Sequence, residues 1–391
     1  MTSHTASRCS QEIHLNRWTL SEVGPVFIIA EIGVNHNGDL ELAKQMVRAA
    51  KAAGADAVKF QTFQTDRLVT KTASMAKYQE RNTGVKETQF EMLKRLELSE
   101  DDHRELAALC ASLDAFFLST PFDPPSVDLL NRIGVEAFKI SSSDTDNFPL
   151  LSKIGRERKP MILSTGMSVL DDVGAALDLL LPLTQDIVVL QCTSEYPCPP
   201  EEAHLAAMCS IRERFGCLVG FSDHTLGSDG ATLAALLGAC LIEKHFTVDR
   251  TLPGPDQVAS SLPEEFAEMV RRVREVDALS PAERKHMLER FPDAKRYLGS
   301  PEKKLSRAVV DSGVSAVAKK SVVAAERIAR GTVIEEHMLT VKRPGTGIAP
   351  VRFNELIGRR ASRDIAVDEL LSWEDLQPIV GENGTAPGKA Q

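Results

Sequence analysis

Eight short apolar segments recur along the first two thirds of the chain, each separated from the next by a helix or by enough residues for one. Their continuous hydrophobic character is typical of strands buried on both faces of a parallel sheet. Eight such units predict a (β/α)8 barrel, the TIM-barrel class of α/β fold. A doubly wound sheet is less well supported, because no GxGxxG motif follows the first segment. The segments are residues 26–35, 57–61, 115–120, 136–141, 160–165, 186–193, 218–222 and 240–245.

The rest of the chain divides around this barrel. The first residues carry no clear periodic pattern, whereas the stretch after the last barrel unit is charged and irregular. Beyond it, short alternating segments are broken by Gly331, Pro344 and Gly345, which predicts a small β-rich domain and not a ninth barrel unit. We therefore expect an N-terminal lead-in (1–22), the barrel (23–279), a linker (280–317), the β-rich domain (318–380) and a tail (381–391).

One connection between predicted strands, residues 62–99, is much longer than the others. Long loops on the C-terminal face of a barrel usually cover or shape the site. We therefore expect this segment, which contains Tyr78, to lie over the barrel mouth. The helices on either side of it have clear start signals, with Asp39 as one N-cap and Ser99 followed by Asp102 as the other.

Composition narrows the class of protein. The net charge of −9 argues against broad nucleic-acid binding. No apolar run approaches the roughly 20 residues that a membrane span needs, and the N-terminus lacks the apolar core of a secretory signal. The seven cysteines include no CxxC pair, so we expect buried free thiols in a reducing cytoplasm.

Two histidines occupy equivalent places at the ends of the last two predicted strands. One strand ends in Ser222-Asp223-His224 and the next in Glu243-Lys244-His245. If these strands are parallel neighbours, both imidazoles point into one mouth, where they could bind a divalent metal completed by water or substrate oxygen. Each histidine could instead be a satisfied core residue, and Glu243 and Lys244 could form a strand-end ion pair.

Polar side chains also end the other predicted strands, where chemistry sits in barrel enzymes. Lysines with hydroxyl donors suit a phosphate or a carboxylate, so these positions indicate a metal-assisted enzyme acting on a small anion. Two other interpretations remain open: Glu31 could be a structural acid paired with Lys59, and the lysines could extend outward to solvent. The strand-end residues are Glu31, Lys59, Gln61, Thr120, Lys139, Ser141 or Ser142, Ser164, Thr193, Tyr196 and Ser222.

A series of motifs resembles one enzyme family. They are AEIGVNHNGD, STPFD, FKISSSD, ILSTGMS, LQCTSEYP, GFSDHT, EKHFTVD, PGPD and VKRPGTGI, in that order. Together they resemble the sialic acid synthase family, including the legionaminate and pseudaminate synthases, over about residues 26–375. The resemblance implies a barrel joined to a C-terminal antifreeze-like (SAF) domain. It also implies a domain-swapped homodimer.

The same resemblance implies roles for individual residues. His224 and His245 would bind Mn2+ or Mg2+, and Glu31 would orient or deprotonate an attacking group. Arg343, from the SAF domain of the partner chain, would reach the N-acyl group of the sugar. The other sugar contacts would be Gln61, Tyr196 and Asp256. Phosphoenolpyruvate would be held by Lys59, Thr120, Lys139, Ser142, Ser164 and Ser222.

The implied activity is that of a transferase that condenses phosphoenolpyruvate with an N-acyl hexosamine in its open-chain form. N-acetylmannosamine, giving N-acetylneuraminate, is the default sugar. The alternatives are 2,4-diacetamido-2,4,6-trideoxymannose, giving legionaminate, then the pseudaminate precursor, then a 6-phosphorylated sugar. Two other classes of protein fit the residues less well. A non-catalytic sugar-binding barrel is disfavoured because all of the polar strand-end residues are present. A Schiff-base aldolase is disfavoured because it needs a lone lysine, whereas here two lysines are matched to an anion.

Three positions depart from the family motifs. Asp144 stands where Glu is common, Ser194 where some members have Asn, and Gln257 where His is usual. We expect Ser194 and Gln257 to lie near the sugar and phosphate pocket. These two departures therefore bear mainly on which sugar the enzyme uses.

Overall fold

The computed structural model describes residues 8–377. Eight parallel strands form one sheet in the order β5-β4-β3-β10-β9-β8-β7-β6, and β5 lies against β6, so the sheet closes into a barrel. The predicted barrel class is confirmed. The strands are β3 (Phe27–Gly33), β4 (Ala57–Thr62), β5 (Phe116–Pro121), β6 (Phe138–Ile140), β7 (Met161–Ser164), β8 (Ile187–Cys192), β9 (Leu218–Asp223) and β10 (Leu241–His245).

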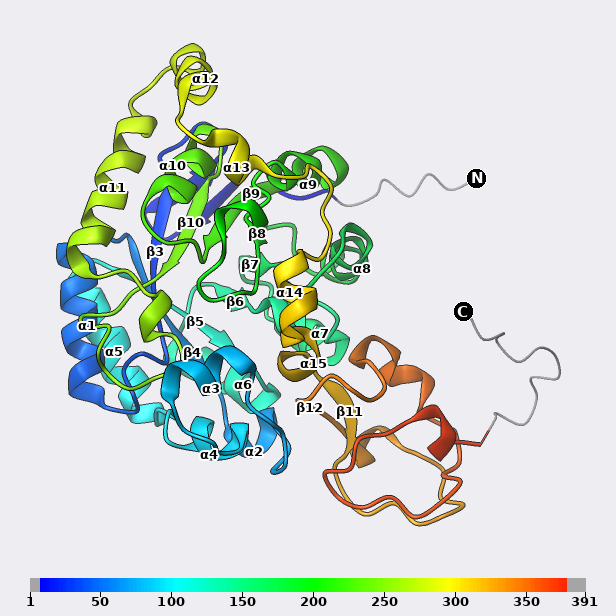
Figure 1. Ribbon diagram of the computed structural model, residues 1–391. Coiled ribbons are helices and arrows are strands. Elements are labelled where there is room, and N and C mark those ends of the chain that lie inside the picture. The colour runs from blue at the N-terminus through cyan, green and yellow to red at the C-terminus, as the bar shows by residue number, and fades with distance from the viewer. Residues whose placement is uncertain (1–7, 378–391) are drawn as a thin grey trace, which may run out of the picture.

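Helices surround this sheet and bury its outer face, as Figure 1 shows. The predicted start signals hold: Asp39 accepts hydrogen bonds from the first turn of α1, and Ser99 forms a capping box with Asp102 at the start of α5. The principal barrel helices are α1 (Leu40–Ala52), α5 (Glu100–Ser112), α6 (Pro124–Ile133), α7 (Phe148–Arg156), α8 (Leu170–Leu180), α9 (Ala207–Phe215), α10 (Asp229–Leu236) and α11 (Pro263–Asp277). No helix among the described residues is long and apolar enough to span a membrane.

The N-terminal segment is more ordered than the expected lead-in. Strands β1 (Glu12–Leu15) and β2 (Trp18–Ser21) form an antiparallel hairpin. Its apolar side chains pack against the first residues of the barrel strands, and Trp18 lies edge-on to Phe27 and Phe116. The hairpin therefore closes the N-terminal end of the barrel. Four-residue strands are too short for a clear alternating pattern, which is why the sequence did not predict them.

The expectation of free thiols is wrong for two cysteines. Cys9, just before this hairpin, forms a disulfide with Cys217, the residue immediately before β9. The partners are 208 residues apart in sequence, so no local spacing could reveal the pair. Cys110, Cys192, Cys198, Cys209 and Cys240 are free thiols.

The long segment after β4 lies on the C-terminal side of the barrel, as predicted. It forms three short helices, α2 (Thr65–Leu68), α3 (Lys77–Thr83) and α4 (Gln89–Lys94). Phe63, Leu68, Met75, Met92 and Leu93 bury a small core of their own above the barrel. This core fixes the segment in place over the strand ends.

The segment 280–317 is largely helical, which corrects the expectation of an irregular linker. It contains α12 (Pro281–Arg290), α13 (Ala294–Leu298), α14 (Arg307–Ser312) and α15 (Val314–Ala318). Ser280 caps α12 in a capping box, although no residue of that helix is buried. Helices this short and polar have little amphipathic periodicity, which is why the sequence reads as irregular.

The C-terminal part is small and β-rich, as predicted. Strands β11 (Ser321–Ala324) and β12 (Leu339–Lys342) pair antiparallel, and isolated bridges join further extended stretches. Val322, Ile334, Leu356, Ile365 and Leu371 form its core. The expected tail at 381–391 lies outside the described residues.

Two ion pairs, one of them fully buried, attach this domain to the barrel of the same chain. Lys320 Nζ lies 2.7 Å from Asp144 Oδ1, and both side chains are fully buried. The same ammonium donates to the carbonyl oxygen of Phe122 at 2.6 Å. Lys319, its neighbour, pairs with Asp146 at 3.0 Å. The loop after β6 therefore anchors the start of the C-terminal domain.

We expect Lys320→Met to lower the free energy of unfolding by about 3–5 kcal/mol, because it leaves the buried Asp144 carboxylate without its cationic partner. Urea unfolding measures the change. Lys342→Met is the matched control, since Lys342 pairs with the half-exposed Asp368 in the same domain. The double variant Lys320→Met/Asp144→Leu should recover part of the loss, whereas a loss equal to the sum of the single variants would contradict coupling of the pair.

Candidate active site

One cavity opens at the C-terminal ends of the barrel strands and gathers every residue to which the resemblance gives a role; Thr193, another predicted strand-end residue, does not line it. Parallel register explains the convergence: Glu31 lies opposite Lys59 on one side and opposite His245 on the other. Gln61 likewise lies opposite Thr120. The predicted residues that line the cavity are Glu31, Lys59, Gln61, Thr120, Lys139, Ser142, Ser164, Tyr196, Ser222, His224, His245, Asp256 and Arg343.

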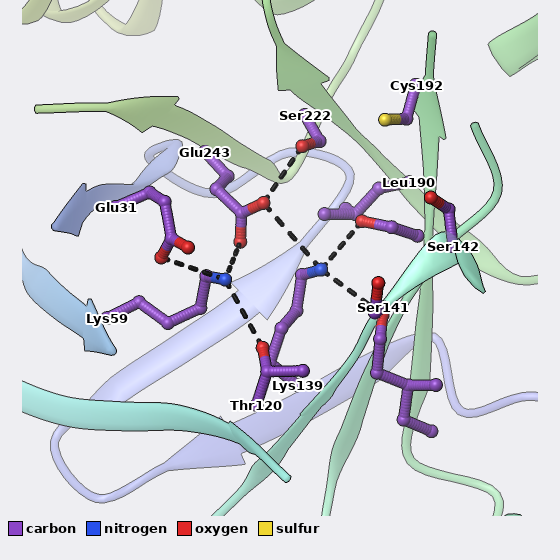
Figure 2. A network of polar contacts seen from close by, with 12 residues as sticks. Glu31, Lys59, Thr120, Lys139, Ser141, Ser142, Leu190, Cys192, Ser222 and Glu243 are labelled. Carbon is purple, nitrogen blue, oxygen red and sulfur yellow. Dashed lines mark hydrogen bonds and ion pairs between the residues drawn. The ribbon is translucent and has the colours of Figure 1, made fainter. Parts of the chain in front are cut away.

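The floor of the cavity is a network of two lysines and two glutamates, shown in Figure 2. Lys59 Nζ lies 2.8 Å from Glu31 Oε2 and 3.6 Å from Glu243 Oε2. Lys139 Nζ lies 3.6 Å from the other oxygen of Glu243. All four side chains are at most 5% exposed, so solvent screens their interactions little.

Hydroxyl groups complete the floor. Lys59 donates to Thr120 Oγ1 at 3.3 Å and Lys139 donates to Ser164 Oγ at 2.7 Å. Ser222 donates to Glu243 Oε1 at 2.8 Å. Buried ammonium groups beside hydroxyl donors form a site suited to phosphate or carboxylate oxygens.

Glu243 is a cavity residue that the sequence interpretation missed. It was considered as a partner of Lys244, but Lys244 instead binds Asp223 Oδ2 at 2.7 Å. Successive side chains of a strand point to opposite faces. Alternation therefore places Glu243 on the same inner face as His245, and this pattern could have revealed it.

The two carboxylates of the floor have opposite proton affinities. Burial raises the pKa of Glu31 to about 7, against the opposing attraction of Lys59. Burial favours a raised pKa for Glu243 as well. The attraction of Lys139 and Lys59 is stronger, however, and lowers the pKa of Glu243 to about 2. Glu243 thus remains a carboxylate, while Glu31 can take up or release a proton near neutral pH.

The two histidines lie together at the side of the cavity, with ring centroids 5.4 Å apart. The Nδ1–H of His224 donates to the carbonyl oxygen of Thr193 at 2.6 Å, which leaves its Nε2 as an acceptor. The buried Nδ1 of His245 has no hydrogen-bond partner among the described residues. Burial and the neighbouring His224 lower the pKa of His245 well below its usual value, so its imidazole is neutral.

These histidines fit a divalent cation in part. A neutral imidazole with a free ring nitrogen is a suitable ligand, and His245 meets this condition. Against the effect of burial, Cys192 and the carbonyl group of Thr193 raise the pKa of His224, so that imidazole must lose a proton before its Nε2 can bind a cation. Within residues 8–377, however, no cluster of three or more His, Cys, Asp and Glu side chains is arranged to hold a metal. A cation bound to this pair would therefore complete its coordination with water or substrate oxygens.

Aromatic rings and Arg343 form the upper part of the cavity. The Tyr196 ring centroid lies 4.1 Å from that of His224 and 5.2 Å from that of Tyr78. Tyr78 is a further cavity residue, and its place in the long segment after β4 was the only sequence signal for it. Burial raises the pKa of Asp256, another lining residue, to about 6.

Arg343 reaches the cavity of its own chain, which differs from the expected contribution by a partner chain. Its backbone N–H donates to the carbonyl oxygen of Leu68 at 2.9 Å, and its carbonyl oxygen accepts from Thr70 at 3.0 Å. The guanidinium lies 5.4 Å from the ring centroid of Phe122. Its buried Nε has no hydrogen-bond partner among the described residues, so one donor is left for a ligand.

The three departures from the family motifs have different surroundings. Ser194 lines the cavity and its hydroxyl lies 3.0 Å from that of Ser142, as expected for a residue near the substrates. Gln257 does not line the cavity, which corrects that expectation; it is buried and donates to the carbonyl oxygen of Asn35 at 2.8 Å. Asp144 is the buried partner of Lys320.

Comparison with known proteins places the chain in a family. Residues 46–285 match the NeuB family and residues 319–377 match the SAF domain. N,N'-diacetyllegionaminic acid synthase of Legionella pneumophila is 44% identical over 356 residues, which cover 90% of this chain and 94% of that protein. Human N-acetylneuraminate-9-phosphate synthase is 35% identical over 365 residues, covering 93% and 96%.

A solved structure gives the same result. The spore coat polysaccharide biosynthesis protein SpsE of Bacillus subtilis has a TM-score of 0.79 and 34% identity to this chain, covering 94% of it and 99% of the SpsE chain. The resemblance to the sialic acid synthases with a SAF domain is thereby confirmed. The chain belongs to the NeuB family.

Proposed function

We propose that this enzyme condenses phosphoenolpyruvate with open-chain 2,4-diacetamido-2,4,6-trideoxymannose to give legionaminate and phosphate. The higher identity to the legionaminic acid synthase than to the human N-acetylneuraminate-9-phosphate synthase supports this sugar. The motifs alone favour N-acetylmannosamine. That sugar is now the second candidate. The observation that carries the reaction is the buried pair of lysines on the cavity floor, beside hydroxyl donors.

In this proposal the floor binds phosphoenolpyruvate. Lys59 and Lys139 hold its phosphate and carboxylate, and Thr120, Ser142, Ser164 and Ser222 donate further hydrogen bonds. The two ammonium groups already face carboxylates, so an incoming anion competes with Glu31 and Glu243 for them. Because the pKa of Glu31 is about 7, Glu31 is a carboxylate above that pH and remains available as a base.

The bond changes follow from the two substrates. C3 of phosphoenolpyruvate attacks the aldehyde carbon, the C2–C3 π electrons form the new C–C bond, and the aldehyde oxygen takes a proton from solvent. Water adds to the cationic C2 and gives one proton to Glu31. The C2–O bond to phosphate then breaks, the second water proton leaves with the phosphate, and C2 becomes a ketone. Glu243 remains a carboxylate near this centre and stabilises the positive charge electrostatically.

The sugar occupies the upper part of the cavity, where Gln61, Tyr196, Asp256 and Arg343 contact it. We propose that His224 and His245 hold Mn2+ or Mg2+. Such a cation would act as a Lewis acid toward the aldehyde. The floor and the upper residues together bring the two reacting carbons into contact. Such positioning of two substrates is a large part of the rate enhancement that a site of this kind can give.

We also propose that the enzyme works as a domain-swapped homodimer. Swapping preserves the contacts of a domain and changes only the chain that supplies them. The contacts of Arg343 with Leu68 and Thr70 would then form between protomers. We further expect the protein to act in the cytoplasm.

The function is tested by phosphate release from phosphoenolpyruvate, with mass spectrometry of the products. The sugars compared are 2,4-diacetamido-2,4,6-trideoxymannose, N-acetylmannosamine, its 6-phosphate and the pseudaminate precursor. We expect the highest kcat/KM with the first, loss of turnover after chelation and recovery with Mn2+. No turnover with any of them would refute the synthase proposal, and full turnover after chelation would refute the histidine assignment.

The raised pKa of Glu31 predicts a pH dependence. The carboxylate form predominates above about pH 7, so kcat/KM for phosphoenolpyruvate should rise as the pH increases through this value. Glu31→Gln should remove this rise and lower kcat by about 10²–10⁴-fold, the usual contribution of a general base. A flat wild-type profile between about pH 6 and 8 would contradict the role of Glu31 as the base.

Arg343→Ala should raise KM for the sugar by about 10-fold or more and leave KM for phosphoenolpyruvate nearly unchanged, because only the sugar lies beside Arg343. The control is Arg352→Ala, which removes an exposed arginine of the same domain. An equal rise in both KM values would contradict contact with the sugar.

The same variant tests domain swapping. Mixing Arg343→Ala with the inactive Lys59→Ala chain restores one complete site per mixed dimer only if each SAF domain serves the partner's barrel. If the mixture after subunit exchange is no more active than its two components, the swap is refuted.

A further inference from the structure

The segment between the two domains forms part of the cavity wall. Val314 and Ala318 of α15 line the cavity together with Ala76 and Met167 from the barrel loops. We call these four residues the apolar wall. Behind it, Val309 of α14 is fully buried in the same cluster. The helices α14 and α15 lie between the barrel and the C-terminal domain in Figure 1.

Hydrogen bonds and ion pairs hold the wall in place. Ser306 caps α14, and the backbone N–H of Arg307 donates to Glu202 Oε2 at 2.9 Å. At the other end, Lys319 pairs with Asp146. The carbonyl oxygen of Ala316 accepts from Gly345 at 2.8 Å, which links α15 to the loop that carries Arg343. The wall is therefore held in position by contacts with both domains.

The wall and the histidines lie on two sides of the stacked tyrosines. Tyr78 packs against the cluster that the wall forms with Val309, and its ring also contacts Tyr196, which in turn contacts His224. These contacts lead from the histidines to the wall. If the aldehyde of the sugar lies at the histidines, as in the proposed function, the far end of the sugar is the part that can reach the wall.

We propose that this wall selects a sugar with a methyl group at that end, and rejects one with a hydroxyl or a phosphate there. The wall residues offer only methyl, methylene and thioether groups, so a hydroxyl against them loses water and gains no hydrogen bond. The methyl group is either C6 of a 6-deoxy sugar or the end of the N-acyl group at C4. This inference rests on the proposed function and specifies which part of the sugar the enzyme recognises.

The test compares Val314→Thr with Val310→Thr. Both variants exchange a methyl for a hydroxyl within one short segment, but Val310 is 60% exposed whereas Val314 is buried against the cavity. The measured quantity is the kcat/KM ratio of 2,4-diacetamido-2,4,6-trideoxymannose to N-acetylmannosamine. We expect Val314→Thr to lower this ratio about 10-fold and to leave KM for phosphoenolpyruvate unchanged, while Val310→Thr changes neither.

Two further sugars distinguish the source of the methyl group. Preference for 2-acetamido-2,6-dideoxymannose over N-acetylmannosamine assigns the wall to C6. Preference for the diacetamido sugar over that 6-deoxy analogue assigns it to the N-acyl group. Ala318→Ser repeats the experiment if Val314→Thr does not fold. An unchanged ratio in the folded variant would overturn the wall proposal, whereas no turnover of any sugar by the wild type would overturn the proposed function itself.

Discussion

The attraction among four buried charges, Lys59, Lys139, Glu31 and Glu243, is the constraint on which the barrel mouth depends. Two ammonium groups cannot be buried side by side unless negative charge lies between them, and Glu243 occupies that place. The parallel register supplies the geometry, because neighbouring strands end at the same level and their inward side chains meet. The arrangement is nearly neutral without substrate, and it contains one carboxyl group, Glu31, that can adjust its charge near neutral pH.

The sequence predicted the barrel and most of its site because both depend on local patterns. Apolar segments marked the strands, and the polar residues that ended them marked the cavity. Glu243 was missed because its neighbour Lys244 offered an apparent partner, although strand alternation sends the two side chains to opposite faces. The hairpin β1–β2 was missed because its four-residue strands are too short to show a clear alternating pattern. The Cys9–Cys217 disulfide and the reach of Arg343 into its own barrel depend on contacts between distant residues, which no local pattern encodes.

The C-terminal domain is joined to the chemistry of the barrel by charge as well as by its peptide link. Lys320 is fully buried against Asp144, and the loop that holds Asp144 also provides Ser142 to the cavity. Asp144 stands where the family motif commonly has the longer Glu, and in this chain it is the partner of a lysine from the other domain. The position of the domain and the shape of the anion site are consequently linked through one loop.

The parallel strands and the segment between the domains build different parts of one cavity from separate lengths of chain. The strands carry the anion site, whereas α15 supplies two of the four residues of the apolar wall and α14 packs behind it. Substitutions at Val314 or Ala318 alter the wall without replacing any residue of the barrel floor. Such an architecture allows relatives to diverge in the sugar they accept while they retain the same carbon–carbon bond-forming centre.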